Sequence, residues 1–109
     1  MSAAGELGWD EADIRPAIEL LSKRWAIPVV VLLWSGPVRR VRLREQLTGI
    51  SDKVLTATLK QLEENGVISR RFYEAVPPRV EYELTMRGRS LSRSLIPLAQ
   101  WARVDGVSR

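Results

Sequence analysis

The sequence contains no cysteine and no histidine among its 109 residues. Without cysteine, the chain has no disulfide, no thiolate nucleophile and no Cys-ligated zinc. Without histidine, it lacks the commonest general base and the commonest metal ligand of proteins. The remaining Asp, Glu, Lys, Arg, Ser, Thr and Tyr residues show no constellation at catalytic spacing. We therefore expect no enzymatic activity, no metal site and no cofactor.

Long apolar segments are also missing. The most apolar run, residues 25–34, has 10 residues, about half of the ~20 that cross a bilayer. The N-terminus lacks the basic region and apolar core that a signal peptide requires. We therefore expect a cytoplasmic protein without a membrane partner.

Charge is present but unevenly distributed. Lys and Arg number 17 against 13 Asp and Glu, for a net charge of +4. Residues 1–22 hold five acids and one base, and residues 23–109 hold sixteen bases and eight acids. A basic body of this size favours an anionic partner, either nucleic acid or an anionic membrane. A solvated basic surface is the alternative, and charge alone does not decide between them.

Apolar periodicity and turn signals predict the order of the elements. Apolar residues spaced i, i+4, i+7 are typical of helices, and Ser51 and Asn65-Gly66 are a good cap and stop for one of them. Val76-Pro77-Pro78 is too stiff and donor-poor for a strand interior, so it predicts a hairpin tip. In chain order we expect a flexible arm (1–9), a helix (10–22), a helix buried on most sides (23–33), a minimal strand (38–41), two helices (42–47 and 52–65), two hairpin strands (68–75 and 79–84), a final helix capped by Thr85 and a tail (105–109). The predicted fold class is mainly α with a small β-hairpin, a winged helix-turn-helix over residues 10–104.

The helix at 52–65 occupies the place of the recognition helix, because the turn at 48–50 joins it to the preceding short helix. With three leucines facing the core, its opposite face carries Lys53, Ala57 and Lys60, with Thr56 and Gln61 beside them, and these residue types suit a major groove. Lys meets phosphate or guanine, Thr donates or accepts at base edges, and Ala fits near a thymine methyl. An ordinary amphipathic helix with a solvated outer face is the alternative for this helix taken alone.

The hairpin shifts the balance toward DNA binding. Arg70 and Arg71 begin its first strand and Arg79 lies by its tip, as a wing that reaches a flanking minor groove or the backbone requires. Glu81 and Glu83 alternate along the second strand. We interpret them as cross-strand ion-pair partners of Arg70 and Arg71 and not as a catalytic carboxylate pair.

Four stretches together resemble the HxlR-type winged-helix transcriptional regulators: AIELLSKRW (17–25), GP followed by basic residues (36–40), LTGISDKVLTATLKQLEENGVISRRFYEAVPPRVEYELTMRGRSL (47–91) and LIPLAQWA (95–102). The most specific part is ISDKVL through LEENGVI followed by VPPRVEYELT. The resemblance covers roughly residues 12–103. It implies a dimeric DNA-binding repressor or activator without enzymatic activity, in which the outer helices pair two protomers.

Matching positions imply roles for individual residues. Ser51 and Lys53 stand at the opening of the recognition helix, Thr56 matches a common threonine, and Arg79 matches the wing arginine after the double proline. Arg24-Trp25 matches a Lys-Trp pair for which a backbone contact is expected. Ala57 and Thr58 replace longer polar residues of many members, which implies a leaner base readout.

Three positions depart from the family. Arg40 replaces an aromatic residue and Arg42 replaces an acid, so both add positive charge near the expected DNA face. We expect at least one arginine there to reach phosphate. The alternative is that they pair across the dimer with the acids of the first helix (Asp10, Glu11 and Asp13). Ala12 stands where some members carry a sensing cysteine, which excludes thiol sensing here.

The expected partners are double-stranded DNA with a palindromic operator and a second copy of the chain, with a small-molecule effector of unknown identity left open. The expected DNA-binding residues are Arg24, Arg40, Arg42, Ser51, Lys53, Thr56, Ala57, Lys60, Arg70 and Arg79. The expected dimer residues are Ile14, Ile18, Leu91, Leu95, Leu98 and Trp101. We expect Trp25, Trp34 and Trp101 in the core or the dimer interface, and an aromatic-ligand pocket is the alternative. The alternative function is a winged-helix protein-interaction module that has lost DNA binding.

Overall fold

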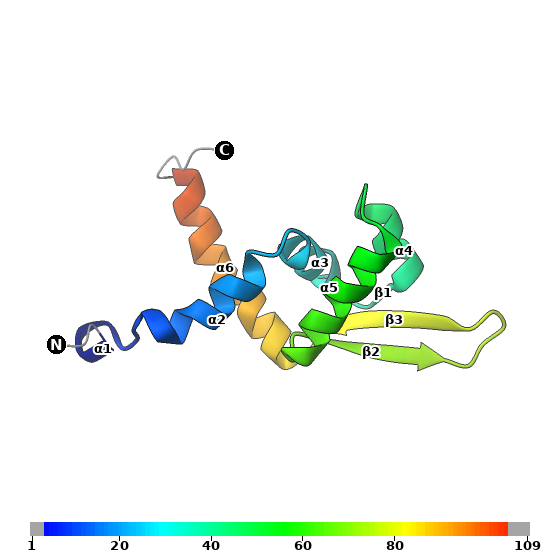
Figure 1. Cartoon of the computed structure of the whole chain (residues 1–109), viewed down its shortest axis with the longest axis horizontal. Coiled ribbons are helices and arrows are strands. Elements are labelled where there is room, and N and C mark those ends of the chain that lie inside the picture. The colour runs from blue at the N-terminus through cyan, green and yellow to red at the C-terminus, as the bar shows by residue number, and fades with distance from the viewer. Residues whose placement is uncertain (1–3, 105–109) are drawn as a thin grey trace.

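The computed structural model describes residues 4–104 of the chain. Helices and a small antiparallel sheet follow one another in nearly the predicted order (Figure 1). The elements are α1 (Ala4–Leu7), α2 (Glu11–Leu21), α3 (Ala26–Leu33), β1 (Val38–Arg39), α4 (Arg40–Gln46), α5 (Asp52–Glu64), β2 (Ile68–Tyr73), β3 (Arg79–Leu84) and α6 (Met86–Val104). The predicted fold class, a mainly helical winged helix-turn-helix, is confirmed.

Two segments near the N-terminus differ from the prediction. Ala4–Leu7 of the predicted flexible arm form one helical turn, with Glu6 in the position that the helix dipole favours for an acid. Residues 1–3 of that arm and the predicted tail at 105–109 lie outside the described residues. The second helix begins at Ala26, three residues after its predicted start, because residues 22–25 form the turn after α2.

The sheet has three strands in the order β1-β3-β2. The two hairpin strands pair from Ile68 opposite Leu84 to Tyr73 opposite Arg79, and Val38 of β1 pairs with Tyr82 on the other edge of β3. The predicted short strand therefore joins the wing sheet. It ends at Arg39, two residues before its predicted end, because the chain turns there into α4 and buries Leu43 in the core.

The hydrophobic core lies between α3, α4, α5 and the inner face of the sheet. Leu55, Leu59 and Leu62 of α5 are buried as predicted, which fixes the outward face of this helix. Ser51 caps α5 by accepting a hydrogen bond from the Val54 amide at 3.1 Å. The remaining buried apolar side chains are those of Ala26, Val29, Val30, Leu33, Leu43, Leu47, Ile50, Val67, Ile68, Tyr82 and Leu84.

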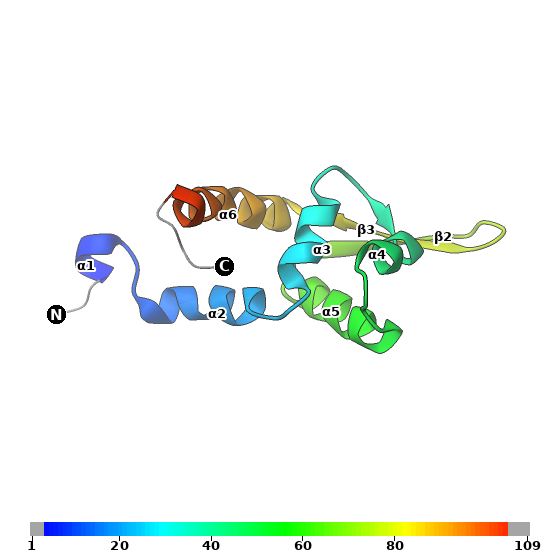
Figure 2. The same ribbon diagram turned by 90° about the horizontal axis from the view of Figure 1, so that it is seen from above.

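The molecule is elongated, with extents of 59 × 28 × 24 Å. Helices α1 and α2 lie at one end and the tip of the β2–β3 hairpin lies at the other (Figures 1 and 2). Its radius of gyration of 16.2 Å exceeds the ~13 Å typical of a compact domain of about 100 residues. Helix α2 buries none of its residues in this protomer. Between residues 4 and 104, no helix combines the length and apolarity that crossing a membrane requires.

The prediction that the second helix is buried on most sides is wrong. Helix α3 buries one face, but Ile27 and Val31 on its other side are 40% and 64% exposed. The sequence of α3 is apolar throughout because the helix has apolar side chains on two of its faces. One packs into the core of the protomer, and the other stays open within the described part of the chain.

Candidate nucleic-acid interface

The outer face of α5 presents the predicted recognition residues to solvent. Lys53, Thr56, Ala57 and Lys60 are all exposed, and Ser51 is exposed at the N-terminal cap. The burial of the three leucines on the opposite side holds this polar face outward. These five predicted residues therefore share one exposed helix surface.

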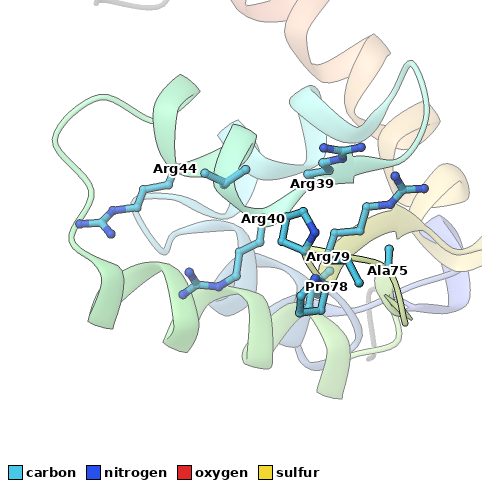
Figure 3. Close-up of a pocket in the computed structure, with 10 residues that line it drawn as sticks. Arg39, Arg40, Arg44, Ala75, Pro78 and Arg79 are labelled. Carbon is cyan, nitrogen blue, oxygen red and sulfur yellow. The ribbon is translucent and has the colours of Figure 1, made fainter.

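A basic hollow of about 580 Å³ lies between the start of α4 and the tip of the wing (Figure 3). Four arginines line it from three elements: Arg39 from β1, Arg40 and Arg44 from α4, and Arg79 from β3. The wing tip closes its other side with Ala75, Val76, Pro77, Pro78 and Val80. Arg39 and Arg44 are missing from the predicted site. The run Arg39–Arg44 signals a basic cluster, but its approach to the wing depends on the pairing of β1 with β3.

Arg40 is bound to α5. Its guanidinium donates from Nη1 to Asp52 Oδ1 at 2.8 Å and from Nη2 to Thr56 Oγ1 at 2.7 Å. Arg44 Nη1 lies 3.6 Å from the same Asp52 oxygen. The hydrogen bond from Arg40, assisted by its charge and by Arg44, lowers the pKa of Asp52 below its usual 3.8. Asp52 is therefore ionised at neutral pH and offsets part of the local positive charge.

The alternative in which Arg40 and Arg42 pair across the dimer with the acids of the first helix needs a second protomer, and it stays a prediction. Within the described protomer, Arg40 pairs with Asp52 and Arg42 lies 3.8 Å from Glu45. The acids of the first helix are used locally. Asp10 and Asp13 form a capping box at the start of α2, and Glu11 pairs with Arg15.

The outer face of the wing carries an alternating row of charges. Arg71 Nη1 donates to the Tyr73 hydroxyl at 3.3 Å, and Arg71 Nη2 lies 3.3 Å from Glu83 Oε1. The hydrogen bond to Tyr73, assisted by the charge of Glu83, raises the pKa of Arg71. The predicted cross-strand ion pairing is thus confirmed for Arg71 and Glu83. The Arg79 guanidinium lies 4.5 Å from the centre of the Tyr73 ring and 3.5 Å from Glu81. These contacts hold Arg79 at the edge of the hollow.

Two predicted DNA-binding residues lie apart from this row. Arg70 is exposed and stands opposite Tyr82, so it projects from the sheet face that turns toward α5. Arg24 lies on the connection between α2 and α3, with its guanidinium 4.8 Å from the centre of the Trp25 ring. It is outside the set of residues that line the basic hollow.

The predicted dimer residues lie in three kinds of place. Ile14, Ile18, Leu98 and Trp101 are 43%, 54%, 55% and 54% exposed, which is high for large apolar side chains. Leu91 is half-buried against the core of its own protomer. Leu95 lines an apolar groove of about 380 Å³ between α3 and α6, together with Ile27, Val30, Val31, Trp34, Ser92, Ile96 and Ala99. The α3 residues of this groove were missed because their apolar pattern was assigned to the core.

The tryptophans divide in the same way. Trp25 is partly buried and packs against the core, as expected for a structural residue. Trp34, at the end of α3, and Trp101, on α6, are 42% and 54% exposed. Trp34 lines the apolar groove between α3 and α6, whereas Trp101 lies outside it.

A helical pair α4–α5, a hairpin wing and a basic surface that spans both define a winged helix-turn-helix protein. The family model of the HxlR-like helix-turn-helix matches residues 20–106, and the chain belongs to this family. The family and its relatives are transcriptional regulators and not enzymes, which confirms the prediction made from the missing histidine and cysteine.

Two relatives show how far the sequence similarity extends. The chain is 34% identical over 101 residues to the helix-turn-helix-type transcriptional regulator YtfH of Escherichia coli, covering 93% of this chain and 80% of YtfH. It is 44% identical over 85 residues to the helix-turn-helix-type regulator sll1512 of Synechocystis, covering 78% of this chain. The aligned region spans 63% of the length of that relative.

Solved structures of regulators have the same fold. A MarR-family transcriptional regulator from Enterococcus faecalis V583 is similar with a TM-score of 0.82 and 32% identity, over 87% of each chain. The reduced form of the transcriptional regulator YodB from Bacillus subtilis is similar with a TM-score of 0.77 and 33% identity, over 83% of this chain and 88% of YodB.

Proposed function

We propose that the protein is a dimeric transcriptional regulator that binds double-stranded DNA sequence-specifically and acts as a repressor. In this proposal α5 enters the major groove, and the β2–β3 wing contacts the flanking minor groove or the backbone. The observation that carries the proposal is the continuity of the basic surface. The exposed face of α5, the four-arginine hollow and the wing tip adjoin one another, as groove and backbone contacts by one domain require.

The contacts divide into base reading and backbone positioning. Thr56 and Ala57 lie on the exposed face of α5 and are proposed to meet base edges, with Lys53 and Lys60 reaching phosphate or guanine. Arg39, Arg44 and Arg79 line the hollow and are proposed to contact phosphates. Arg42, which is exposed on α4 outside this lining, is proposed to contact a phosphate as well. The remaining predicted contacts are Ser51 at the N-terminus of α5, Arg70 on the wing, Arg40 at the start of α4 and Arg24 on the connection between α2 and α3.

The proposed dimer rests on apolar surface at the end of the molecule opposite the wing. Ile14 and Ile18 of α2 and Leu98 and Trp101 of α6 remain exposed in a protomer whose shape is too extended to cover them. Burying these side chains against a second copy is favourable, since each large apolar side chain contributes about 1.5–3 kcal/mol when fully buried. Two protomers joined there would present two wings outward. A two-fold dimer of this kind matches a palindromic operator.

Selection of binding sites from a randomised duplex library tests the proposal. The wild-type protein is expected to enrich a palindromic site and to bind it more tightly than random duplex. Arg79→Ala is expected to weaken binding to the enriched site and to random DNA alike, whereas Thr56→Ala is expected to act mainly on the enriched site, by about 1 kcal/mol. Arg93→Ala, on the exposed surface of α6, is the matched control and should change neither affinity.

Each outcome of the selection has a distinct meaning. Failure to enrich any site, together with no binding at low salt, would contradict the proposal and favour a protein-interaction module. Equal losses for the wing and helix variants on both DNAs would contradict the division into base reading and backbone positioning.

A further inference from the structure

The guanidinium of Arg40 spans one turn of the proposed recognition helix. Asp52 and Thr56 are four residues apart on α5, and the two Nη atoms of Arg40 donate to one side chain each, at 2.8 and 2.7 Å. Nη2 also lies 3.5 Å from the Asp52 carbonyl oxygen. Figure 3 shows Arg40 extending from the start of α4 toward α5. A planar fork that bridges two side chains holds both of them in one geometry.

The bond to Thr56 fixes the direction in which its hydroxyl can donate. A threonine hydroxyl has one proton to donate and two lone pairs that accept. Arg40 occupies a lone pair, so the proton of Thr56 remains for a different acceptor. The neighbouring Thr58 shows the contrast, because its hydroxyl donates to the Val54 carbonyl at 2.8 Å. Within residues 4–104, the Thr56 hydroxyl donates to no protein acceptor and is exposed.

The environment of Arg40 sets it apart from the other arginines of the segment. Its side chain is 29% exposed, compared with 64% for Arg42 and 53% for Arg44. Its charge faces the ionised carboxylate of Asp52, which would compete with a DNA phosphate for the same donors. Arg40 is thus built into the protein surface, whereas Arg42 and Arg44 project from it.

We propose that Arg40 is a positioning residue for sequence reading, which orients Thr56 so that its hydroxyl donates to an acceptor atom of a base pair in the major groove. Guanine O6 and N7, adenine N7 and thymine O4 are the acceptors displayed there. The inference rests on the proposed DNA-binding function and extends it to a specificity determinant.

Binding of variants to the enriched site and to random duplex, each measured across a range of salt, tests this role. Thr56→Val removes the hydroxyl and keeps the shape, and Thr56→Ser keeps the hydroxyl. Arg40→Lys keeps the charge but loses the planar fork. Arg40→Ala removes both, and Arg42→Ala is the matched control for the loss of one exposed charge on the same helix.

Arg40→Lys and Thr56→Val are each expected to lower the ratio of specific to random affinity about tenfold, as the loss of one base contact does. Random-DNA affinity should stay within about twofold for Arg40→Lys because the charge is kept. The double variant should lose no more than either single variant, since both remove the same contact. Thr56→Ser should retain the preference. Arg42→Ala should lower both affinities equally and reduce the salt slope by about 0.9 per protomer.

The inference is overturned if Arg40→Ala behaves like Arg42→Ala, with equal losses on both DNAs and the same drop in salt slope. It is also overturned if the losses from Arg40→Lys and Thr56→Val add up. Both results leave the proposed function intact, because the wild-type protein still enriches a site. If the wild-type protein binds no DNA, the proposed function fails and this inference fails with it. Circular dichroism of each variant verifies that it is folded.

Discussion

Gly88 lies where α6 passes over the connection between α5 and β2, and a side chain has no room there. A Cβ atom on Gly88 would lie 2.0 Å from the Val67 carbonyl oxygen and 3.1 Å from a methyl group of Leu84. An ordinary contact needs at least 3.4 Å, so the backbone of α6 or of Val67 must move by roughly 1.4 Å. The same carbonyl oxygen accepts a hydrogen bond from the Thr85 amide at 3.0 Å. Gly88→Ala therefore disturbs both the packing and the cap of α6.

Two contributions of Gly88→Ala lower the free energy of unfolding, and one raises it. Overpacking of a well-packed site costs about 1–3 kcal/mol, and weakening the bonds to Val67 adds about 1 kcal/mol. Replacing glycine by alanine inside a helix returns about 1 kcal/mol. We expect a net loss of about 1–3 kcal/mol in the free energy of unfolding.

Urea unfolding followed by circular dichroism, at one fixed protein concentration, measures this loss. Ser90→Ala is the matched control, because Ser90 is exposed on the same helix, and surface changes of this kind stay within about 0.5 kcal/mol. An unfolding midpoint for Gly88→Ala equal to that of the control would refute the close approach of α6 to Val67.

Three further predictions concern the core, the dimer and the acid at the head of α5. Leu59→Ala removes a side chain that is 1% exposed and should lower the free energy of unfolding in urea by about 2–5 kcal/mol. A loss below about 1 kcal/mol would show that α5 does not pack as described. Ile18→Glu should shift the mass in light scattering from dimer to monomer while the exposed control Glu19→Ala stays dimeric, and an unchanged mass for Ile18→Glu would place the interface elsewhere. The lowered pKa of Asp52 means that its ionised form stabilises the fold above pH 3.8 and that this stabilisation is lost as the pH falls through the lowered pKa. Asp52→Asn should therefore be less stable than wild type at pH 6 and equally stable at the acid end of the titration, and a difference that persists at low pH would contradict the Arg40 contact as its cause.

Local signals were sufficient to predict much of the fold. The bounds of α5 followed from a serine cap, three leucines at helical spacing and a glycine that adopts φ +71° after the helix. The double proline between two alternating segments marked the wing. These features depend on residues within a few positions of one another, which is why the sequence alone reveals them.

The parts that were missed depend on contacts between distant segments. Arg40 meets Asp52 and Thr56 across 12 and 16 residues, and no periodicity encodes the angle between α4 and α5 that brings them together. The close approach of Gly88 to Val67 is likewise a property of tertiary packing. The apolar pattern of α3 indicates that the helix is buried, but it does not show whether each face packs against the same protomer or against another surface. The exposed face was therefore assigned to the core.

In the proposed function, the arginine hollow between α4 and the wing binds the phosphate backbone of DNA. The most direct test is the salt dependence of binding to random duplex for Arg39→Ala/Arg44→Ala, compared with the control Arg93→Ala/Arg103→Ala on α6. Because each phosphate contact contributes about 0.9 to the slope of log affinity against log salt, removing two contacts should flatten the slope by about 1.8 per protomer. The control should keep the wild-type slope. Equal slopes for the two double variants would contradict the assignment of this surface to DNA.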